Sequence, residues 1–141
     1  METVTRNAQE TKELGRKIGS SLVGGEVLAL VGDLGAGKTT FVQGLAEGLG
    51  IKSKIISPTF ILMKQQELPA GGTLYHVDLY RLEGDVDREV VNLGLPDIWG
   101  RGGNIVVVEW AEKSKTSFPP ETVWINFEHT GEDERKITVN K

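Results

Sequence analysis

The sequence lacks cysteine, so disulfide bonds and metal sites built on thiolates are excluded. It also lacks a long hydrophobic run, because no apolar stretch approaches the roughly 18 residues that a membrane-spanning helix needs. The opening segment METVTRNAQETKELG has neither the basic region nor the apolar region of an export signal. From these absences we expect a cytoplasmic protein with no membrane segment.

The sequence also has fewer basic than acidic residues. The chain has 16 Lys and Arg against 20 Asp and Glu, which gives a formal net charge of -4. Direct binding to nucleic acid depends on clustered positive charge, so we expect any role with RNA to be indirect. What is present is an ordinary globular composition, with 38% hydrophobic and 26% charged residues in a chain of 141. This length suits one core, and we expect residues 1–141 to form a single domain.

Some segments of the sequence have apolar residues at the spacing of a helix, and others have the unbroken apolar runs of buried strands. Glu26–Val31 and Asn104–Trp110 contain the runs VLALV and IVVV. Such runs are typical of strands that are buried on both faces of a parallel sheet. Thr11–Leu22 and Asp85–Leu93 are predicted helices, the first because its apolar residues are spaced four apart. The order of these elements predicts an α/β fold.

Glycines and turn residues mark the remaining elements. A third helix is predicted downstream of residue 37, where Gly48 and Gly50 are available to end it. Hairpins are predicted from FILMK and TLYHVDLYRL around the turn LPAGG, and from TVWINF and RKITV around EHTGEDE. The apolar stripe of the third helix consists of Phe41, Val42, Leu45, Ala46 and Leu49.

The segment Gly32–Thr39 reads GDLGAGKT and matches the pattern G-x-x-x-x-G-K-[ST] between a predicted strand and a predicted helix. Glycines let phosphate oxygens approach backbone N–H groups, and the helix N-terminus adds further donors. In this pattern Lys38 reaches the β and γ phosphates, and the Thr39 hydroxyl helps to hold magnesium. The alternative is a glycine-rich connection that contains Lys-Thr by chance. The flanking strand and helix favour a P-loop NTPase-like domain, with a central mixed, partly parallel sheet flanked by helices.

Two carboxylates end apolar strands. Glu109 follows Ile105–Val108, and Asp78 ends TLYHVD. Because the carboxyl ends of parallel strands border the crevice beside a P-loop, both are candidates for magnesium binding or for positioning the attacking group. Either could instead be a solvated residue at a strand end. His76 shares the strand face of Asp78, and we interpret it as a structural, hydrogen-bonded histidine.

The segment Ser57–Phe60, SPTF, is a further candidate. Its hydroxyl at Thr59 could follow the γ-phosphate as the switch threonine of a GTPase does. A local turn before a strand explains the same residues equally well. The residues alone leave both interpretations open.

Taken together, GDLGAGKTT, SPTF, Tyr75–Arg81 and Val108–Trp110 resemble the TsaE family, formerly called YjeE, and they occur in the family's order. The resemblance spans nearly the whole chain. TsaE proteins are P-loop ATPases that bacteria need, with TsaD and TsaB, to form threonylcarbamoyladenosine in tRNA. The resemblance therefore implies that this chain binds ATP and Mg²⁺, hydrolyses ATP, and reaches tRNA only through the TsaD and TsaB proteins.

The resemblance also implies roles for residues at matching positions. Lys38, Asp78 and Glu109 would be catalytic, with Asp78 essential to hydrolysis, and Thr39 and Glu109 would lie beside magnesium. Thr59 would belong to a switch-like loop near the nucleotide. The N-terminal segment around residues 8–11 would contact ATP. The predicted ATP-binding residues are Gly35, Ala36, Gly37, Lys38, Thr39, Thr40, Thr59, Thr11 and Arg135.

Other P-loop functions fit less well. A GTPase would need a base-reading N-K-x-D segment, which is not visible, and a small-molecule kinase would need a lid that bears arginines. A noncatalytic nucleotide-binding interaction module stays open as an alternative. The chain has no obvious arginine finger, Arg81 being the nearest candidate. We therefore expect an ATPase that is slow alone and is activated by its partners.

Overall fold

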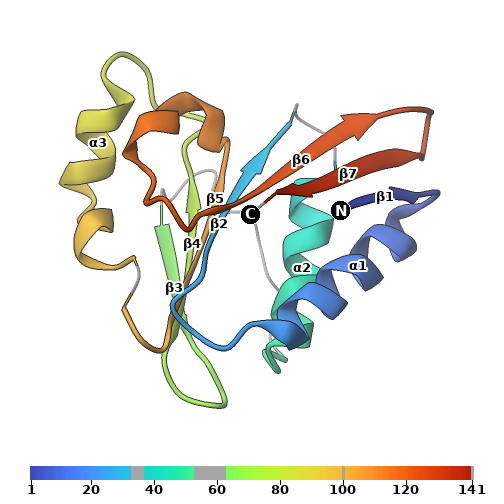
Figure 1. Ribbon diagram of the computed structural model, residues 1–141, viewed down its shortest axis with the longest axis horizontal. Helices are drawn as coiled ribbons and strands as arrows, with labels where there is room; N and C mark the ends of the chain where they lie inside the picture. Colours follow the sequence, from blue (N-terminus) through green and yellow to red (C-terminus); the bar gives the residue numbers. More distant parts are fainter. Residues whose placement is uncertain (33–36, 53–62, 100, 141) are drawn as a thin grey trace.

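The computed structural model describes residues 1–32, 37–52, 63–99 and 101–140. Figure 1 shows a central sheet with α1 and α2 on one side and α3 on the other. The predicted α/β fold is confirmed. The helices are α1 (Ala8–Ser21), α2 (Lys38–Gly48) and α3 (Val86–Asn92), with the short 3-10 helices η1 (Leu95–Asp97) and η2 (Ala111–Ser117). The strands are β1 (Glu2–Thr5), β2 (Val27–Val31), β3 (Met63–Glu67), β4 (Thr73–Asp78), β5 (Asn104–Glu109), β6 (Val123–His129) and β7 (Arg135–Asn140).

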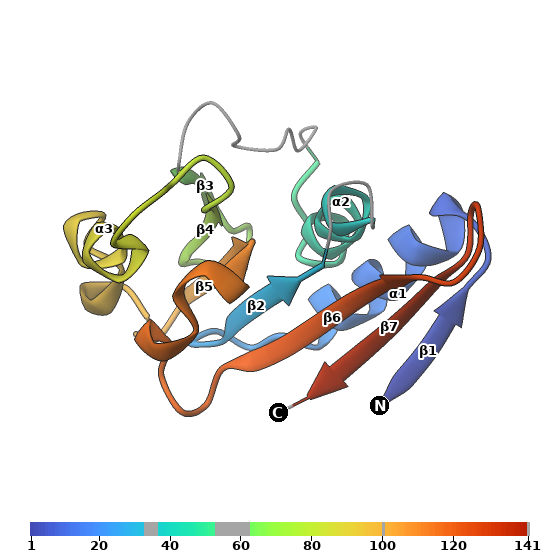
Figure 2. The same cartoon turned by 90° about the horizontal axis from the view of Figure 1, so that it is seen from above.

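In the described ranges the strands form one seven-stranded mixed sheet in the order β1-β7-β6-β2-β5-β4-β3. The four strands β6, β2, β5 and β4 are parallel, while β3, β7 and β1 add antiparallel pairs at the two sides. Figure 2 shows the twist of this sheet seen from above. The carboxyl ends of the parallel strands lie at the edge where the chain leaves β2 toward α2. In register, Leu30 pairs with Glu109, and Glu109 pairs with Asp78.

The run VLALV is buried on both faces, as its sequence predicts. Leu28 and Leu30 belong to the core beneath α1 and α2, whereas Val27 and Ala29 belong to the core beneath α3. None of these four side chains is more than 3% exposed. Side chains alternate across a strand, so the two cores lie on opposite faces of the sheet.

Glycines bring α1 and α2 into backbone contact. A Cβ atom at Gly15 would overlap the carbonyl oxygen of Phe41, and one at Gly44 would overlap that of Lys12. Only glycine permits so close an approach without displacing one helix. The glycines that meet the backbone of the facing helix are Gly15, Gly19, Gly44 and Gly48.

Large aromatic side chains fill the space on the α3 face instead. The ring centroids of Trp99 and Phe118 are 5.3 Å apart, and those of Phe118 and Trp124 are 5.1 Å apart. These rings pack against the buried cluster that includes Val90 of α3 and Val106 of β5. Trp99 and Trp124 therefore serve core packing.

A group of hydroxyls ties α3 to η2. Asp87 accepts hydrogen bonds from Ser114, from Ser117 at 2.9 Å and from Thr116 at 3.2 Å. These bonds, the one from Ser114 first, hold the pKa of the Asp87 carboxyl below its ordinary value of 3.8. The carboxylate thus joins two elements that are far apart in the sequence.

The predicted hairpin β6–β7 forms, and β3 pairs with β4 as expected from residue 63 onward, whereas residues 60–62 of FILMK lie outside the described ranges. Strand β4 ends at Asp78, so the DLYRL part of the predicted strand lies largely beyond it. The first helix begins at Ala8 rather than at the predicted Thr11, because the side chain of Asn7 caps it by accepting from the Glu10 N–H at 2.8 Å. Strand β1 was not predicted, and it pairs with β7. No helix within the described ranges is long and apolar enough to cross a membrane.

Candidate functional site

The candidate site begins at the N-terminus of α2. Gly37 precedes the helix with φ of 97°, a left-handed conformation that favours glycine. Because this residue has no side chain, no side-chain cap covers the first turn, which contains Lys38, Thr39 and Thr40. The N–H groups and the positive end of the helix dipole make such a turn a good place for an anion.

Lys38 is unusually buried for a lysine, at 4% exposure. Its ammonium group donates a hydrogen bond to the carbonyl oxygen of Gly32, directly after β2. The same nitrogen lies 3.7 Å from the centroid of the Trp110 ring, directly after β5. A cation over an indole face is attracted by the ring electrons. The positive charge is therefore held between the carboxyl ends of two parallel strands.

Asp78 and Glu109 end β4 and β5, and they are register partners. Each is 3% exposed. Asp78 Oδ1 accepts a hydrogen bond from the Tyr80 N–H at 2.8 Å, while Glu109 Oε2 lies 2.6 Å from Nε2 of His76. Their strand positions alternate with Val77 and Val108 of the α3 core, so both carboxylates lie on the α2 face of the sheet.

Thr11 and Arg135 come from opposite ends of the chain and meet beside Gly37. A Cβ atom at Gly37 would lie 3.5 Å from Cγ2 of Thr11 and 3.9 Å from Cγ and Nε of Arg135. Thr11 is held by a 2.7 Å hydrogen bond between its hydroxyl and that of Thr5 on β1. Arg135 donates through Nη1 to the carbonyl oxygens of residues 132 and 134, at 3.2 and 3.0 Å.

The family model described as "Threonylcarbamoyl adenosine biosynthesis protein TsaE" matches residues 5–137.

The chain belongs to the TsaE family.

Among its relatives named "tRNA threonylcarbamoyladenosine biosynthesis protein TsaE", the one from Bacillus subtilis is 42% identical over 95% of this chain and 81% of the relative. The one from Treponema pallidum is 41% identical over 99% of both chains. The crystal structure of Bacillus subtilis YdiB matches with a TM-score of 0.79 and 36% identity, over 99% of this chain and 83% of that one. The likeness therefore covers the sheet and all the elements around the site.

Several residues predicted from the TsaE resemblance lie outside the described ranges. These are Gly35 and Ala36 of the loop and Thr59 of the SPTF segment. The other predicted site residues lie at the α2 N-terminus, at the carboxyl ends of β4 and β5, or beside Gly37. Their roles in this TsaE-family chain stay predictions.

Three residues around the site were missed by the sequence analysis. Trp110 has φ of 60°, so the chain turns sharply as β5 ends and the ring comes to lie beside Lys38. Lys113 donates to the carbonyl oxygens of Tyr80 and Leu82 at 2.6 and 2.9 Å, which ties η2 to the loop after β4. The third is Glu112. No periodicity marks such contacts, because they join residues that lie from 31 to 80 positions apart in the sequence.

Glu112 accepts a hydrogen bond from the Gly32 N–H through Oε2 at 3.3 Å. Within the described ranges its other oxygen, Oε1, is buried without a hydrogen-bond partner. The side chain lines a surface cavity of about 490 Å³ together with residues at the ends of β2 and β6. Glu112 thus helps to fix the start of the segment that leads into α2.

The side chains at this edge fit a hard cation. Thr39, Asp78 and Glu109 offer only oxygen atoms, which Mg²⁺ prefers as ligands. In the described part of the chain, no group of three or more His, Asp or Glu side chains could hold a metal ion by itself. A magnesium ion here would need oxygens from water and from phosphate, as is usual for magnesium bound with a nucleotide.

Proposed function

We propose that this TsaE-family chain binds ATP with Mg²⁺, hydrolyses it slowly, and acts with TsaD and TsaB in forming threonylcarbamoyladenosine in cytoplasmic tRNA. One observation carries the proposal. The buried ammonium group of Lys38 lies at the start of α2, beside the strand end that carries Glu109 and, next to it, Asp78. This arrangement combines an anion-binding helix terminus, a cation and two carboxylates at one edge of the sheet.

Each group has a separate task in the proposal. The N–H groups from Gly35 to Thr40 hold the phosphates, and Lys38 leaves the Gly32 carbonyl to contact the β and γ phosphates. Thr39 and Glu109 hold Mg²⁺, which would supply charge neutralisation at the phosphates. Asp78 orients the attacking water, since its Oδ1 is already fixed by the Tyr80 N–H. Thr11 and Arg135 contact the nucleotide near Gly37, and Thr59 follows its γ-phosphate.

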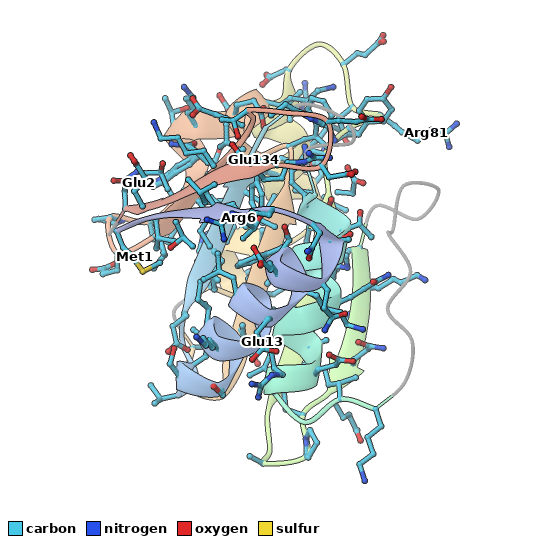
Figure 3. The ribbon with its side chains drawn as sticks, turned by 90° about the vertical axis from the view of Figure 1, so that its right-hand side faces the viewer. Met1, Glu2, Arg6, Glu13, Arg81 and Glu134 are labelled. Atoms are coloured by element: carbon cyan, nitrogen blue, oxygen red, sulfur yellow. The ribbon has the colours of Figure 1, made fainter. Side chains whose placement is uncertain are left out.

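The position of Arg81 supports the proposal that turnover is slow without partners. This side chain extends outward from the loop after β4, away from the body of the protein (Figure 3). Fast phosphoryl transfer needs a cation that stabilises charge in the transition state, and supplying it in trans is worth roughly 10³-fold or more in other P-loop enzymes. A partner would bring its own cation or turn Arg81 inward.

The outward direction of Arg81 also favours the second candidate, a noncatalytic nucleotide-binding interaction module. The two candidates differ in a single measurement, steady-state phosphate release by the purified chain alone and with TsaD, TsaB and tRNA. An ATPase gives a slow basal rate that the partners raise and that Lys38→Ala abolishes. Nucleotide binding without any phosphate release, alone or with partners, would contradict the ATPase and leave the interaction module.

A further inference from the structure

A buried histidine contacts the carboxylate that ends β5. His76 Nε2 and Glu109 Oε2 are 2.6 Å apart, although the residues are 33 positions apart in sequence. Their side chains are 4% and 3% exposed. A carboxylate only accepts hydrogen bonds, so the Nε2–H of His76 is the donor to Glu109.

The sheet register accounts for this contact. His76 pairs with Val107, and Glu109 lies two positions further along β5 on the same face. A side chain as long as that of histidine can reach the residue two positions beyond its register partner on the adjacent strand. Asp78 has a different partner, the N–H of Tyr80 in its own loop. The direction of the Glu109 carboxylate is thus set by a side chain of the neighbouring strand.

We propose that His76 is a positioning residue that fixes the Glu109 carboxylate for Mg²⁺, an inference that rests on the proposed function. A buried carboxylate that loses its donor is left with an unsatisfied oxygen, which favours other rotamers or local opening. Held through Oε2, the group keeps a fixed direction and offers Oε1 to the ion or to water bound to it. Loss of such an outer partner typically lowers metal affinity by about 10–100-fold.

Substitutions of His76 can distinguish the effect of its Nε2–H donor from the effect of its ring volume. His76→Phe keeps the ring volume but removes the Nε2–H group, whereas His76→Gln keeps an N–H donor near the same place. The chain's other histidine, His129, is exposed at the end of β6 and supplies the matched control His129→Phe. If His76→Phe does not fold, His76→Asn gives the same comparison, because its amide ends short of the Nε2 position.

The measurement is calorimetric binding of a non-hydrolysable ATP analogue over a series of Mg²⁺ concentrations and in EDTA. Mg²⁺ is expected to tighten binding of the analogue. We expect His76→Phe to raise, by about 10-fold or more, the Mg²⁺ concentration at which half of this increase in affinity is reached. The affinity of the His76→Phe variant for the analogue in EDTA stays at the wild-type value. His76→Gln and His129→Phe follow the wild-type magnesium curve. In a Glu109→Gln background, His76→Phe has no further effect on that curve, because the partner through which it acts is already changed.

Three results would overturn the inference. An unchanged magnesium curve in His76→Phe would show that Glu109 needs no such partner. Equal weakening with Mg²⁺ and in EDTA would assign His76 a general structural role. Additive effects of His76→Phe and Glu109→Gln would show that His76 acts elsewhere. A wild-type chain that fails to bind the analogue with Mg²⁺ would instead overturn the proposed function, and this inference with it.

Discussion

On one face of the sheet, α1 and α2 touch through glycines and backbone atoms, whereas on the other face the rings of Trp99, Phe118 and Trp124 pack against the buried cluster that includes the apolar residues of α3. The first face carries the candidate site, because α2, His76, Asp78 and Glu109 all lie there. A backbone contact has no side chain that can adjust, while a contact between large rings can repack. The comparison teaches that the contact between α1 and α2 is the one that tolerates the least change in volume.

The largest effect is expected at the site itself, from Asp78→Asn. The amide oxygen still accepts from the Tyr80 N–H, so the loop keeps its geometry, but the group that orients water loses its charge. We expect partner-stimulated phosphate release to fall by about 100-fold or more, with ATP affinity unchanged. Phosphate-release kinetics and calorimetry check this, with the exposed Asp97→Asn as control. Full activity of Asp78→Asn would remove Asp78 from the mechanism.

On the site face, Gly44→Ala adds a single methyl group where the backbone of Lys12 already lies. Overpacking costs about 1–3 kcal/mol. Alanine gains about 1 kcal/mol of helix propensity over glycine. Because the new methyl group would overlap backbone atoms of Lys12, the overpacking cost is at the upper end of its range, and we expect a net loss of about 2 kcal/mol in the free energy of unfolding. Denaturant unfolding measures it against Gly102→Ala, a position with no atom within 4 Å of the new methyl. Equal midpoints for the two variants would contradict a rigid helix contact.

On the α3 face, Phe118→Leu removes part of a ring between Trp99 and Trp124. Because the neighbours can repack around another large apolar residue, we expect the free energy of unfolding to fall by about 1 kcal/mol. This loss is smaller than that of Gly44→Ala, although more atoms change. The same unfolding titration gives the value. A loss larger than that of Gly44→Ala would reverse the comparison between the faces.

The smallest effect concerns the carboxylate that joins α3 to η2. Since the pKa of Asp87 is lowered in the folded protein, its contribution to stability is full above its ordinary value of 3.8 and is lost as the pH falls below it. Asp87→Asn should therefore melt slightly below the wild type near neutral pH, with the gap closing in stronger acid. Thermal unfolding at a series of pH values tests this, and a gap that widens in acid would refute it.

The central part of the fold could be predicted because its signals are local. An unbroken apolar run, a glycine loop and an amphipathic stripe each specify an element from neighbouring residues, and β2 and α2 formed as expected. Strand β1 has no such signal: ETVT is short, and its partner β7 lies at the other end of the chain. Gly48, interpreted as a helix terminator, is also a contact residue, since a Cβ atom there would overlap the carbonyl oxygen of Arg16.

The candidate site also has a part that could be predicted from local sequence and a part that could not. Motif spacing identified Lys38, Asp78 and Glu109, because strand ends and loops can be located along the sequence. The partners of these groups depend on which strands are neighbours and in which register. His76 on Glu109 and Trp110 on Lys38 therefore became visible only in the folded chain.

The glycines between α1 and α2 also bear on how the helices form. A glycine in a helix loses more conformational entropy on folding than alanine would, at a cost of about 0.5–1 kcal/mol for each position. Gly15 and Gly19 make α1 a weak helix in isolation, so its helical structure depends on docking against α2. We therefore expect Thr11 to take its place beside Gly37 only when α1 docks against α2.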